Sequence, residues 1–533
     1  MRAVFYLTLL FSAFVLNACR QTAEQQSPTN TSAARREQHR PQFHFSPPTQ
    51  WMNDPNGMFY YEGEYHLFYQ YYPDSNVWGP MHWGHAVSTD LAHWQDLPIA
   101  LYPDSLGYIF SGSAVVDQHN TSGLGTKEQP PIVAIFTYHY AEGERAGRND
   151  FQYQGIAYST DKGRTWTKYA GNPVIPNTQS IRDFRDPKVI WHEASQQWVM
   201  VFAAYDHLKF WGSKNLLQWR HLSDFGKEWG SHAGVWECPD LFPMQVEGSG
   251  ETQWALLCSI NPGGPNGGSG TQYFIGQFDG EQFELDATFA ENLKKDKAVW
   301  LDYGRDNYAG VTWSGLPDTQ RRLFLGWMSN WDYAQVVPTT AWRSAMTLPR
   351  DLRLLATPNG HRIASWPAPE LQQLRTATHP LKSVLVDGRS ELTLPAGVVA
   401  AQTELELEWE LPENGSGEFG IELSNSLGET YRIGYNIENQ QFYSDRRNAG
   451  KKDFSGKFAS GLHLAPRIGN DKVLRMRLFL DAASVEMFAD NGATALTDIF
   501  FPNENFNHIA LYSEKGAVKL AGGNMYPLRR IWD

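Results

Sequence analysis

AVSTDLAHWQDL (residues 86–97) is the first of four related stretches that decide the fold. AYSTDKGRTWTKY (157–169), WGSKNLLQWRHL (211–222) and IGQFDGEQFELD (275–286) repeat its order: a strand ends, a turn follows, and an aromatic residue precedes another strand. These aromatic residues recur at intervals of about 50 to 70 residues, as repeated supersecondary units do; they are Trp94, Trp166, Trp219 and Phe283. We interpret the repetition as a series of four-stranded units.

The sequence around these repeats favours a β-propeller. From about Phe43 onward, short apolar runs alternate with Gly, Pro, Asn and Asp turns, and stretches with helical periodicity are few. Radial packing of small sheets buries both of their faces and leaves only short edges. At about 64 residues per unit, the region from 41 to 365 accommodates about five blades. A set of packed β-sandwiches is the alternative architecture.

The pattern changes after residues 364–375, a segment broken by prolines. Residues 403–411 and 473–481 alternate apolar with charged side chains, as antiparallel strands with one solvated face do. We therefore predict an all-β protein: a five-bladed β-propeller catalytic domain over residues 41–365, a linker over 366–385 and a β-sandwich domain over 386–533.

Residues 1–40 have the pattern of an export signal and a tether. Arg2 and an apolar run over residues 3–16 precede Asn17, Ala18 and Cys19, and the run is short for a membrane span. Residues 1–19 resemble a bacterial lipoprotein signal peptide with Cys19 as the lipidation site, and an ordinary signal is the alternative. Residues 20–40 are polar, which predicts a flexible tether. We expect export and a lipid anchor on the periplasmic or cell-surface side of a membrane.

The amino-acid composition limits the classes of ligand that the protein is expected to bind. The net charge of −13 argues against nucleic acid, because phosphate binding needs a basic surface. The 20 Trp and 24 Tyr residues suit surfaces that hold sugar rings, and they equally suit an aromatic β core. After Cys19 only Cys238 and Cys258 remain, which is no disulfide framework, and we expect free thiols.

Motifs for cofactors and metal ions are weak. His82 and His85 would face opposite sides of a strand, so a metal site with His93 is not expected. The Gly-rich stretch 261–270 lacks the lysine and the helix of a phosphate-binding loop. We expect no cofactor and no metal ion.

Three carboxylates stand in unusual surroundings: Asp54 in WMNDPNG (51–57), Asp186 in FRDPKV (184–189) and Glu237 in VWECPDLF (235–242). Each would fall in a different blade. WMNDPNG alone is also compatible with a plain turn. An apolar setting beside Trp236 and Cys238 is expected to raise the pKa of Glu237, whereas Arg185 is expected to keep Asp186 ionised. One carboxyl group with a raised pKa beside a second that stays ionised is a combination typical of acid/base catalysis.

Together with FSGS (110–113) and GWMSNW (326–331), these motifs resemble glycoside hydrolase family 32, the β-fructosidases, which include invertases, inulinases and levanases. SVEMFADNG (484–492) followed by FFP (500–502) resembles the sandwich of that family. The resemblance implies a retaining hydrolase of terminal β-fructofuranosyl units, in which the two catalytic carboxyl groups stand about 5 to 5.5 Å apart.

The resemblance also implies a role for each acid. Asp54 would be the nucleophile and Glu237 the general acid and then the base, while Asp186 would bind fructose hydroxyls and stabilise the charge of the transition state. Arg185 beside it would set the electrostatics of the pocket. The remaining fructose-binding residues that the family implies are Asn53, Asn56, Gln70, Trp78, Phe110, Ser111, Asp240 and Trp331, of which Trp78 and Trp331 could instead be core aromatics.

The segment 75–88, which carries Trp78, closes one side of the pocket in this family, and a closed pocket favours removal of one terminal unit. We expect an exo-acting β-fructofuranosidase that releases fructose from levan or inulin, and also from sucrose. An invertase acting mainly on sucrose, a non-catalytic fructan-binding lipoprotein and a five-bladed arabinoside hydrolase are the alternatives. The sequence implies fructan or sucrose as partner and indicates no oligomeric state.

Overall fold

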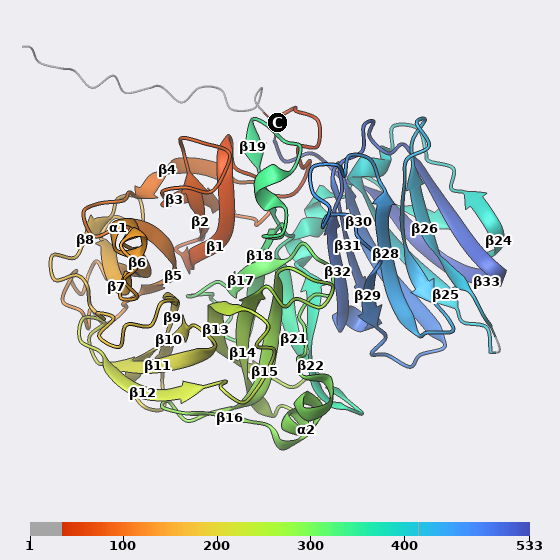
Figure 1. Ribbon diagram of the computed structural model, residues 1–533. Coiled ribbons are helices and arrows are strands. Elements are labelled where there is room, and N and C mark those ends of the chain that lie inside the picture. The colour runs from red at the N-terminus through yellow and green to blue at the C-terminus, as the bar shows by residue number, and fades with distance from the viewer. Residues whose placement is uncertain (1–34, 414, 533) are drawn as a thin grey trace, which may run out of the picture.

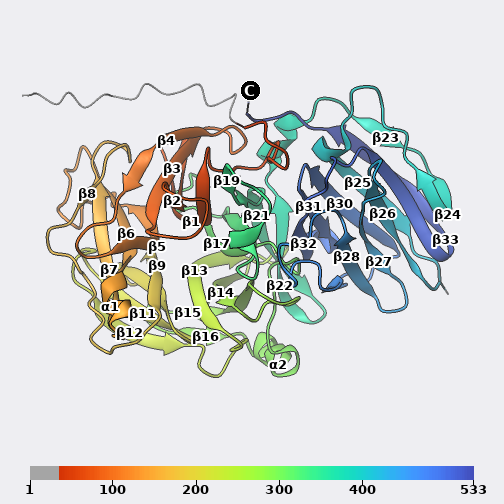
Figure 2. The same cartoon turned by 45° about the horizontal axis from the view of Figure 1, so that its top comes forward.

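The structure, a computed structural model, describes residues 35–413 and 415–532 and is built almost entirely of strands (Figure 1). Five sheets of four or five strands are followed along the chain by one sheet of eleven strands. In both views the five small sheets surround a common centre, and the large sheet lies beside them (Figures 1 and 2). The predicted fold class, a five-bladed β-propeller followed by a β-sandwich, is confirmed.

Each small sheet is one blade of the propeller. Blade I contains β1 (Gln50–Tyr61), β2 (Glu64–Tyr72), β3 (His82–Ser88), β4 (Gln95–Leu101) and β19 (Trp342–Arg343). Blade II contains β5 (Tyr108–Val116), β6 (Ile132–His139), β7 (Gln152–Ser159) and β8 (Thr167–Lys168). Blade III contains β9 (Phe184–His192), β10 (Gln197–Ala204), β11 (His207–Ser213) and β12 (Arg220–Phe225).

Blade IV contains β13 (Val235–Gln245), β14 (Thr252–Asn261), β15 (Gly270–Phe278) and β16 (Phe283–Leu285). Blade V contains β17 (Tyr308–Thr312), β18 (Leu323–Met328), β20 (Ala345–Met346), β21 (Arg350–Thr357) and β22 (Gly360–Pro367). The first strands of the five blades contact one another in a closed ring from β1 through β5, β9 and β13 to β17. Parallel pairing of β19 with β1 ties the segment after β18 back to blade I.

The four aromatic repeats mark the entry to the outermost strand of a blade. Trp94, Trp166 and Trp219 immediately precede β4, β8 and β12, and Phe283 opens β16. The indoles of Trp166 and Trp219 each donate a hydrogen bond to the carbonyl three residues earlier, which closes the turn before the strand. This arrangement confirms the interpretation of the repeats as blade units, and it also explains why five blades gave four repeats: blade V enters β22 through the turn 357–360 without such an aromatic residue.

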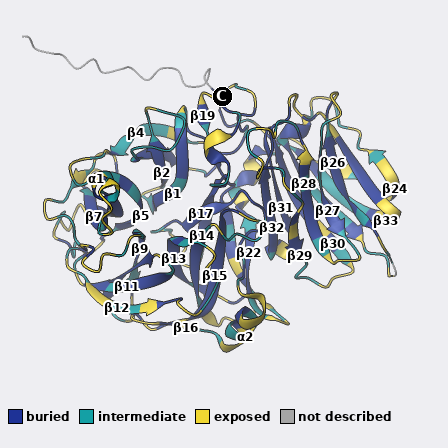
Figure 3. Ribbon diagram, viewed as in Figure 1, coloured by how far each residue is buried: buried dark blue, intermediate teal, exposed yellow. Residues whose placement is uncertain are grey.

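The helices lie outside the blades. Within residues 35–413 and 415–532 they are α1 (Ala141–Arg145), α2 (Ala287–Asp296) and four short 3₁₀ segments, η2 (Ala334–Val336), η3 (Pro369–Leu374), η4 (Ala400–Gln402) and η5 (Asp490–Gly492). Asp286 caps α2 by accepting a hydrogen bond from the N–H of Phe289. Most strands of the blades and of the C-terminal sheet are buried along most of their length (Figure 3).

The C-terminal sheet is the predicted sandwich. It contains β23 (His379–Leu381), β24 (Val384–Glu391), β25 (Thr403–Glu410), β26 (Glu418–Ser424), β27 (Thr430–Asn436), β28 (Gln441–Asn448), β29 (His463–Pro466), β30 (Val473–Asp481), β31 (Ser484–Ala489), β32 (Thr494–Ile499) and β33 (His508–Pro527). The long strand β33 pairs with β24, β25 and β26 and thereby joins both halves of the sheet. Leu405, Leu407 and Trp409 of β25 are buried, as their alternation predicts.

The N-terminal segment 35–46 fastens the propeller to the sandwich. The ring of His44 lies 2.6 Å from Asp481 and 2.9 Å from Glu486, and all three side chains are fully buried. Burial lowers the pKa of His44, but these two carboxylates outweigh it and raise the pKa to about 9. Arg350 of the propeller also binds Glu486, so one ionic network spans the junction.

Residues 35–40 belong to the part of the chain for which a flexible tether is expected, yet Arg35 and Arg40 are buried. Arg35 forms an ion pair with Asp96 at 2.6 Å, and Arg40 stacks over the ring of Trp342 at 3.7 Å. The predicted signal peptide, Cys19 and the rest of the predicted tether lie outside the described residues.

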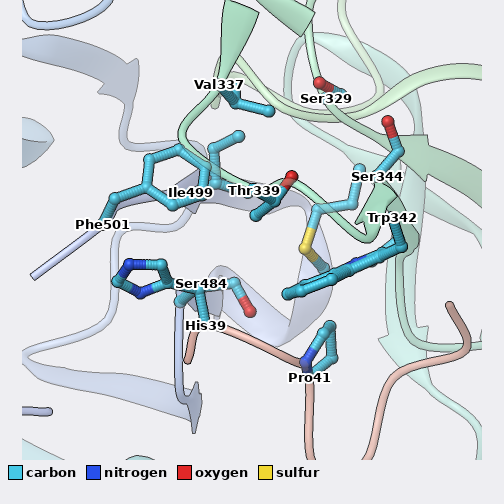
Figure 4. A pocket seen from close by; sticks show the side chains of 13 residues that line it. His39, Pro41, Ser329, Val337, Thr339, Trp342, Ser344, Ser484, Ile499 and Phe501 are labelled. Carbon is cyan, nitrogen blue, oxygen red and sulfur yellow. The ribbon is translucent and has the colours of Figure 1, made fainter. Parts of the chain in front are cut away.

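A cavity of about 40 Å³ lies at the junction between this segment, the loop after β18 and the sandwich (Figure 4). His39, Thr339 and Ser344 line it with polar atoms that have no hydrogen-bond partner among the described residues. Burial lowers the pKa of His39 to about 4, so the ring is neutral around pH 7. The same loop carries Trp331 and Gln335 to the site described next.

Candidate active site

A polar cavity of about 260 Å³ lies where the first strands of blades I to IV meet. β1 contributes Asp54, β5 contributes Ser111, β9 contributes Asp186 and β13 contributes Glu237. The full lining is Asn53, Asp54, Gln70, Trp78, Phe110, Ser111, His139, Glu144, Gln152, Asp183, Arg185, Asp186, Glu237, Trp331 and Gln335. The three acids of the sequence motifs therefore come from three blades and share one cavity.

Asp54 lies on a bulged part of β1. The register between β1 and β2 shifts between Met52 and Pro55, so WMNDPNG is a bulged strand and not the plain turn that was also compatible with its sequence. The amide of Asn53 donates to Oδ1 of Asp54 at 3.0 Å, and the hydroxyl of Ser111 donates to Oδ2 at 2.8 Å. Burial, with the nearby charge of Glu237, raises the pKa of Asp54.

Asp186 has a left-handed backbone, with φ of 65°. The N–H of Cys238 donates to its Oδ2 at 3.0 Å. Burial raises the pKa of Asp186 to about 7, because the charges of Glu237 and Asp54 add to burial and exceed the opposing effect of Arg185. The prediction that Arg185 keeps Asp186 fully ionised is therefore wrong: the guanidinium Nε is 3.9 Å from Asp186.

Arg185 instead binds Glu237. Its Nη2 and Nε donate to Oε1 of Glu237 at 2.9 and 3.1 Å, and its Nη1 donates to Asp183 at 2.6 Å. The hydroxyl of Tyr308 donates to the other oxygen of Glu237. Trp236, expected as an apolar neighbour of Glu237, is fully buried in the hydrophobic cluster formed by blades III and IV. Glu237 thus lies in charged and hydrogen-bonded surroundings.

Cys238 is a buried thiol between two of the acids. Its Sγ lies 3.6 Å from Oδ2 of Asp54 and 3.6 Å from Oδ2 of Asp186. Burial and the neighbouring carboxylates raise the pKa of Cys238 well above its usual value, so the thiol stays protonated and can donate. Cys238 and Cys258, the two cysteines of the described part of the chain, are both free.

Asn56 and Asp240 lie outside the cavity that holds the other predicted residues. Asn56 is buried, and its amide donates to the carbonyl of Asp54 at 3.3 Å. Asp240 is fully buried and accepts hydrogen bonds from Lys188 at 3.0 Å and from the N–H of Thr312 at 2.6 Å. A register shift between Glu237 and Asp240 separates the two acids of WECPD, and neither Asp240 nor Asn56 lines this cavity; their contact with the sugar stays a prediction.

Several lining residues were not predicted from the sequence: His139, Glu144, Gln152, Asp183 and Gln335, with Tyr308 behind Glu237. Asp183 lies directly before β9, and its spacing of two residues from Arg185 is the signal in the sequence that could have marked it. The others belong to strand ends and loops without a motif, and only the packing of blades II, IV and V brings them to the acids.

Two family models match the chain. The description "Glycosyl hydrolases family 32 N-terminal domain" covers residues 44–367, and "Glycosyl hydrolases family 32 C terminal" covers residues 370–527. The chain is 47% identical over 498 residues to a levanase of Bacillus subtilis, covering 93% of this chain and 71% of that protein. It is 38% identical over 519 residues to an extracellular exo-inulinase of Aspergillus niger, covering 93% and 95%.

The chain is also similar, in fold and in sequence, to solved structures. The crystal structure of an exo-inulinase from Aspergillus awamori matches with a TM-score of 0.84 at 34% identity, covering 93% of this chain and 100% of that one. A β-fructofuranosidase from Schwanniomyces occidentalis, solved with fructosyl-erythritol, matches with a TM-score of 0.82 at 32% identity, covering 94% and 99%.

Proposed function

The chain belongs to glycosyl hydrolase family 32, and we propose that it is an exo-acting β-fructofuranosidase that releases terminal fructose from fructans by retaining hydrolysis. The observation that carries the proposal is the meeting of Asp54, Asp186 and Glu237 in one polar cavity. A pair of carboxylates with different surroundings is what hydrolysis of a glycosidic bond requires.

In the first step Asp54 attacks the anomeric carbon, C2, of the terminal fructosyl unit. Glu237 gives its proton to the glycosidic oxygen, so that the bond from C2 to that oxygen breaks while the bond from C2 to Asp54 forms. Hydrogen bonds from Asn53 and Ser111 fix the attacking carboxylate, since each engages a different oxygen. Orienting the nucleophile in this way lowers the entropic part of the barrier.

In the second step Glu237, now a carboxylate, takes a proton from water. The hydroxide that forms attacks C2 and displaces Asp54, which returns both acids to their starting protonation states. Asp186 acts on the charge that develops in both steps. A positive ring favours the ionised form of Asp186, so a carboxylate with a pKa of about 7 in the empty cavity becomes a better stabiliser as the transition state forms.

The shape of the cavity suits a single terminal unit. Trp78 packs edge-on against Phe110, with ring centroids 6.1 Å apart, and Trp331 stacks on Trp51 at 5.9 Å. These aromatic walls and the depth of the acids favour a chain end over an internal segment. Removal of one fructose at a time is accordingly the action that we propose for levan- or inulin-type fructans and for sucrose.

We further propose that the protein is exported and that Cys19 carries a lipid anchor. The named relatives include an extracellular exo-inulinase, which supports export. Among the residues that the structure describes, no helix is long and apolar enough to cross a membrane. Labelling with a radioactive fatty acid tests the anchor: Cys19→Ser should abolish the label and release the protein from the membrane fraction, and unchanged labelling would refute it.

A product profile on sucrose, inulin and levan tests the function. We expect fructose as the only small early product from inulin and levan, and fructose with an equal amount of glucose from sucrose, measured by chromatography during the first few per cent of conversion. A ladder of oligosaccharides would refute exo action. Binding of levan or inulin without any release would instead support a non-catalytic fructan-binding protein, and release from sucrose alone would support an invertase.

A further inference from the structure

The mouth of the catalytic cavity carries a carboxylate that the proposed mechanism does not use. Glu144 lies on α1, in the loop between β6 and β7, and lines the cavity while its side chain is 39% exposed. Glu142, on the same short helix, does not line the cavity and accepts a hydrogen bond from the hydroxyl of Tyr140. One acid of α1 is therefore directed to the site, and the other offers a matched control.

A chain of hydrogen bonds connects Glu144 to the group that holds the acid Glu237. Oε1 of Gln152 accepts from the N–H of Phe184 at 2.8 Å and from Nη1 of Arg185 at 3.3 Å. These two donors fix the orientation of the amide, so its Nε2 is the group that faces Nδ1 of His139 at 3.3 Å. Gln152 therefore donates to His139, and the ring carries its proton on Nε2.

The fixed ring of His139 in turn orients the carboxylate of Glu144. Its Nε2 lies 3.1 Å from Oε2 of Glu144, and with the proton on that nitrogen it donates to the carboxylate. The ring is buried and stacks on Phe110, with centroids 4.3 Å apart and planes inclined by 8°. Glu144 is thus held by a side chain that cannot turn, in contrast to an ordinary surface carboxylate.

Glu144 keeps hydrogen-bonding capacity for a ligand. A carboxylate offers about four acceptor positions; His139 uses one, and Arg182 approaches Oε1 only at 3.5 Å with a largely exposed side chain. Burial lowers the pKa of His139 to about 4, so this ring is a neutral donor near pH 7 and does not neutralise the carboxylate. An oriented carboxylate with free acceptor positions suits the hydroxyl groups of a neutral sugar.

The position of Glu144 indicates which sugar it meets. Glu237 protonates the oxygen of the leaving group, and Arg185 holds Glu237, so the chain from Arg185 through Gln152 and His139 extends on the side of the acid. Resting on the proposed function, we propose that Glu144 accepts hydrogen bonds from the sugar unit that leaves, and that it distinguishes glycosidic leaving groups with hydroxyls from those without.

Substrates with and without a leaving sugar test this subsite. Replacing Glu144→Ala should lower kcat/KM for sucrose and for short inulin-type oligosaccharides by about tenfold or more, the worth of hydrogen bonds to a charged group. Hydrolysis of methyl β-fructofuranoside, whose leaving group is methanol, should be unchanged. Glu142→Ala should leave both reactions unchanged, and thermal unfolding should show that each variant is folded.

Two further results bear on the assignment. His139→Phe, which keeps the stacking on Phe110 but loses the donor, should reproduce part of the Glu144→Ala loss on sucrose. Equal losses on the two substrate classes would overturn the proposal, because they would indicate a general effect on the pocket; no loss on either would overturn it as well. Failure of the proposed function is distinguishable, since the unaltered protein would then hydrolyse neither substrate.

Discussion

Arg185 donates two hydrogen bonds to one oxygen of Glu237, at 2.9 and 3.1 Å, although Asp186 is its neighbour in the chain. The left-handed backbone of Asp186 interrupts the regular strand geometry at this point, so that both side chains line the cavity: Arg185 binds Glu237, and Asp186 accepts a hydrogen bond from the N–H of Cys238. Burial lowers the pKa of Arg185, but the carboxylates around it, first of all Glu237, outweigh burial and leave the pKa raised, so Arg185 remains a fixed cation. The relationship places a permanent positive charge on the group to which we assign both proton transfers.

Removing this cation should impair catalysis more than folding. We expect Arg185→Leu to lower kcat/KM for sucrose by on the order of 10² to 10³, because Glu237 loses both its orientation and its charge partner. Asp183→Asn, which keeps an acceptor for Arg185, is the milder control. A loss of less than about threefold in Arg185→Leu, measured by steady-state kinetics, would contradict the positioning role.

The nucleophile assignment predicts a nearly inactive variant that remains folded. Asp54→Asn keeps the shape of the side chain and hydrogen-bonding partners for Asn53 and Ser111, but it cannot form the fructosyl-enzyme. We expect a loss in kcat of at least about 10³-fold, with an unchanged circular dichroism spectrum. Near-normal turnover would refute the assignment.

Glu237→Gln tests the other half of the mechanism. Without a proton donor or a base, both steps slow. On a substrate whose leaving group departs without protonation, such as p-nitrophenyl β-fructofuranoside, the fructosyl-enzyme still forms, and a small anion that needs no base can capture it. We therefore expect azide to restore turnover and to give β-fructofuranosyl azide, identified by NMR. An azide product of inverted configuration would indicate an inverting mechanism, with a wider separation of the two carboxyl groups than the 5 to 5.5 Å expected here.

Asp186 links activity to stability. Its pKa of about 7 in the folded protein exceeds its ordinary value of 3.8, so the folded state binds the proton more tightly than the unfolded state. The resulting stability is fully present below pH 3.8 and is lost as the pH rises through 7. Asp186→Asn avoids this loss, and we expect its Tm to exceed that of the unaltered protein by a few degrees at pH 8 and by little at pH 4.

The same substitution should cost activity. Removing the charge that stabilises the oxocarbenium-like transition state is expected to lower kcat by on the order of 10² to 10³. Scanning calorimetry and kinetics on one preparation measure both effects. A variant that is slower without being more stable at pH 8 would contradict the ionisation argument and leave the catalytic role intact.

The sequence predicted the acids and the blades because both depend on local pattern. An aromatic residue at the entry to each outer strand repeats along the chain, and motifs such as WMNDPNG stand out by composition. The partners of these acids depend on packing between blades. Tyr308 of blade V reaches Glu237 of blade IV, and Arg185 of blade III reaches the same acid, contacts between residues far apart in sequence that no local pattern encodes.

The sequence also failed to predict which carboxylate Arg185 pairs with, because that pairing too depends on the packing between blades. Adjacency in sequence suggested that Arg185 would stabilise the charge of Asp186, whereas its guanidinium donates its hydrogen bonds to Glu237 and Asp183. The buried environment of Asp186 includes Asp54 and Cys238 from other blades. The positions of Asn56 and Asp240 outside the cavity likewise follow from bulges in β1 and β13, because a bulge changes the direction of a side chain and no particular composition marks it in the sequence.

The stability of the junction between propeller and sandwich should depend on pH. His44 gains its charge from Asp481 and Glu486, and its pKa of about 9 exceeds the unfolded value of 6.5, so this stabilisation is complete below pH 6.5 and disappears as the pH rises through 9. His44→Gln leaves the buried Asp481 without its cation and Glu486 with Arg350 alone, a loss of about 3 to 5 kcal/mol. His93, whose ring is half exposed at 2.9 Å from Asp90, is the control, and His93→Gln should change stability by less than about 1 kcal/mol.

Melting curves of the two variants between pH 6 and pH 10 measure this difference. We expect the Tm deficit of His44→Gln to be largest at pH 6 and to shrink above pH 9, where the unaltered protein also loses its cation. Because Leu348 and Arg350 of the propeller bind Glu486 as well, the deficit should extend to both halves of the chain and not to the sandwich alone. A deficit that is constant with pH would mean that His44 acts through its packing rather than through its charge.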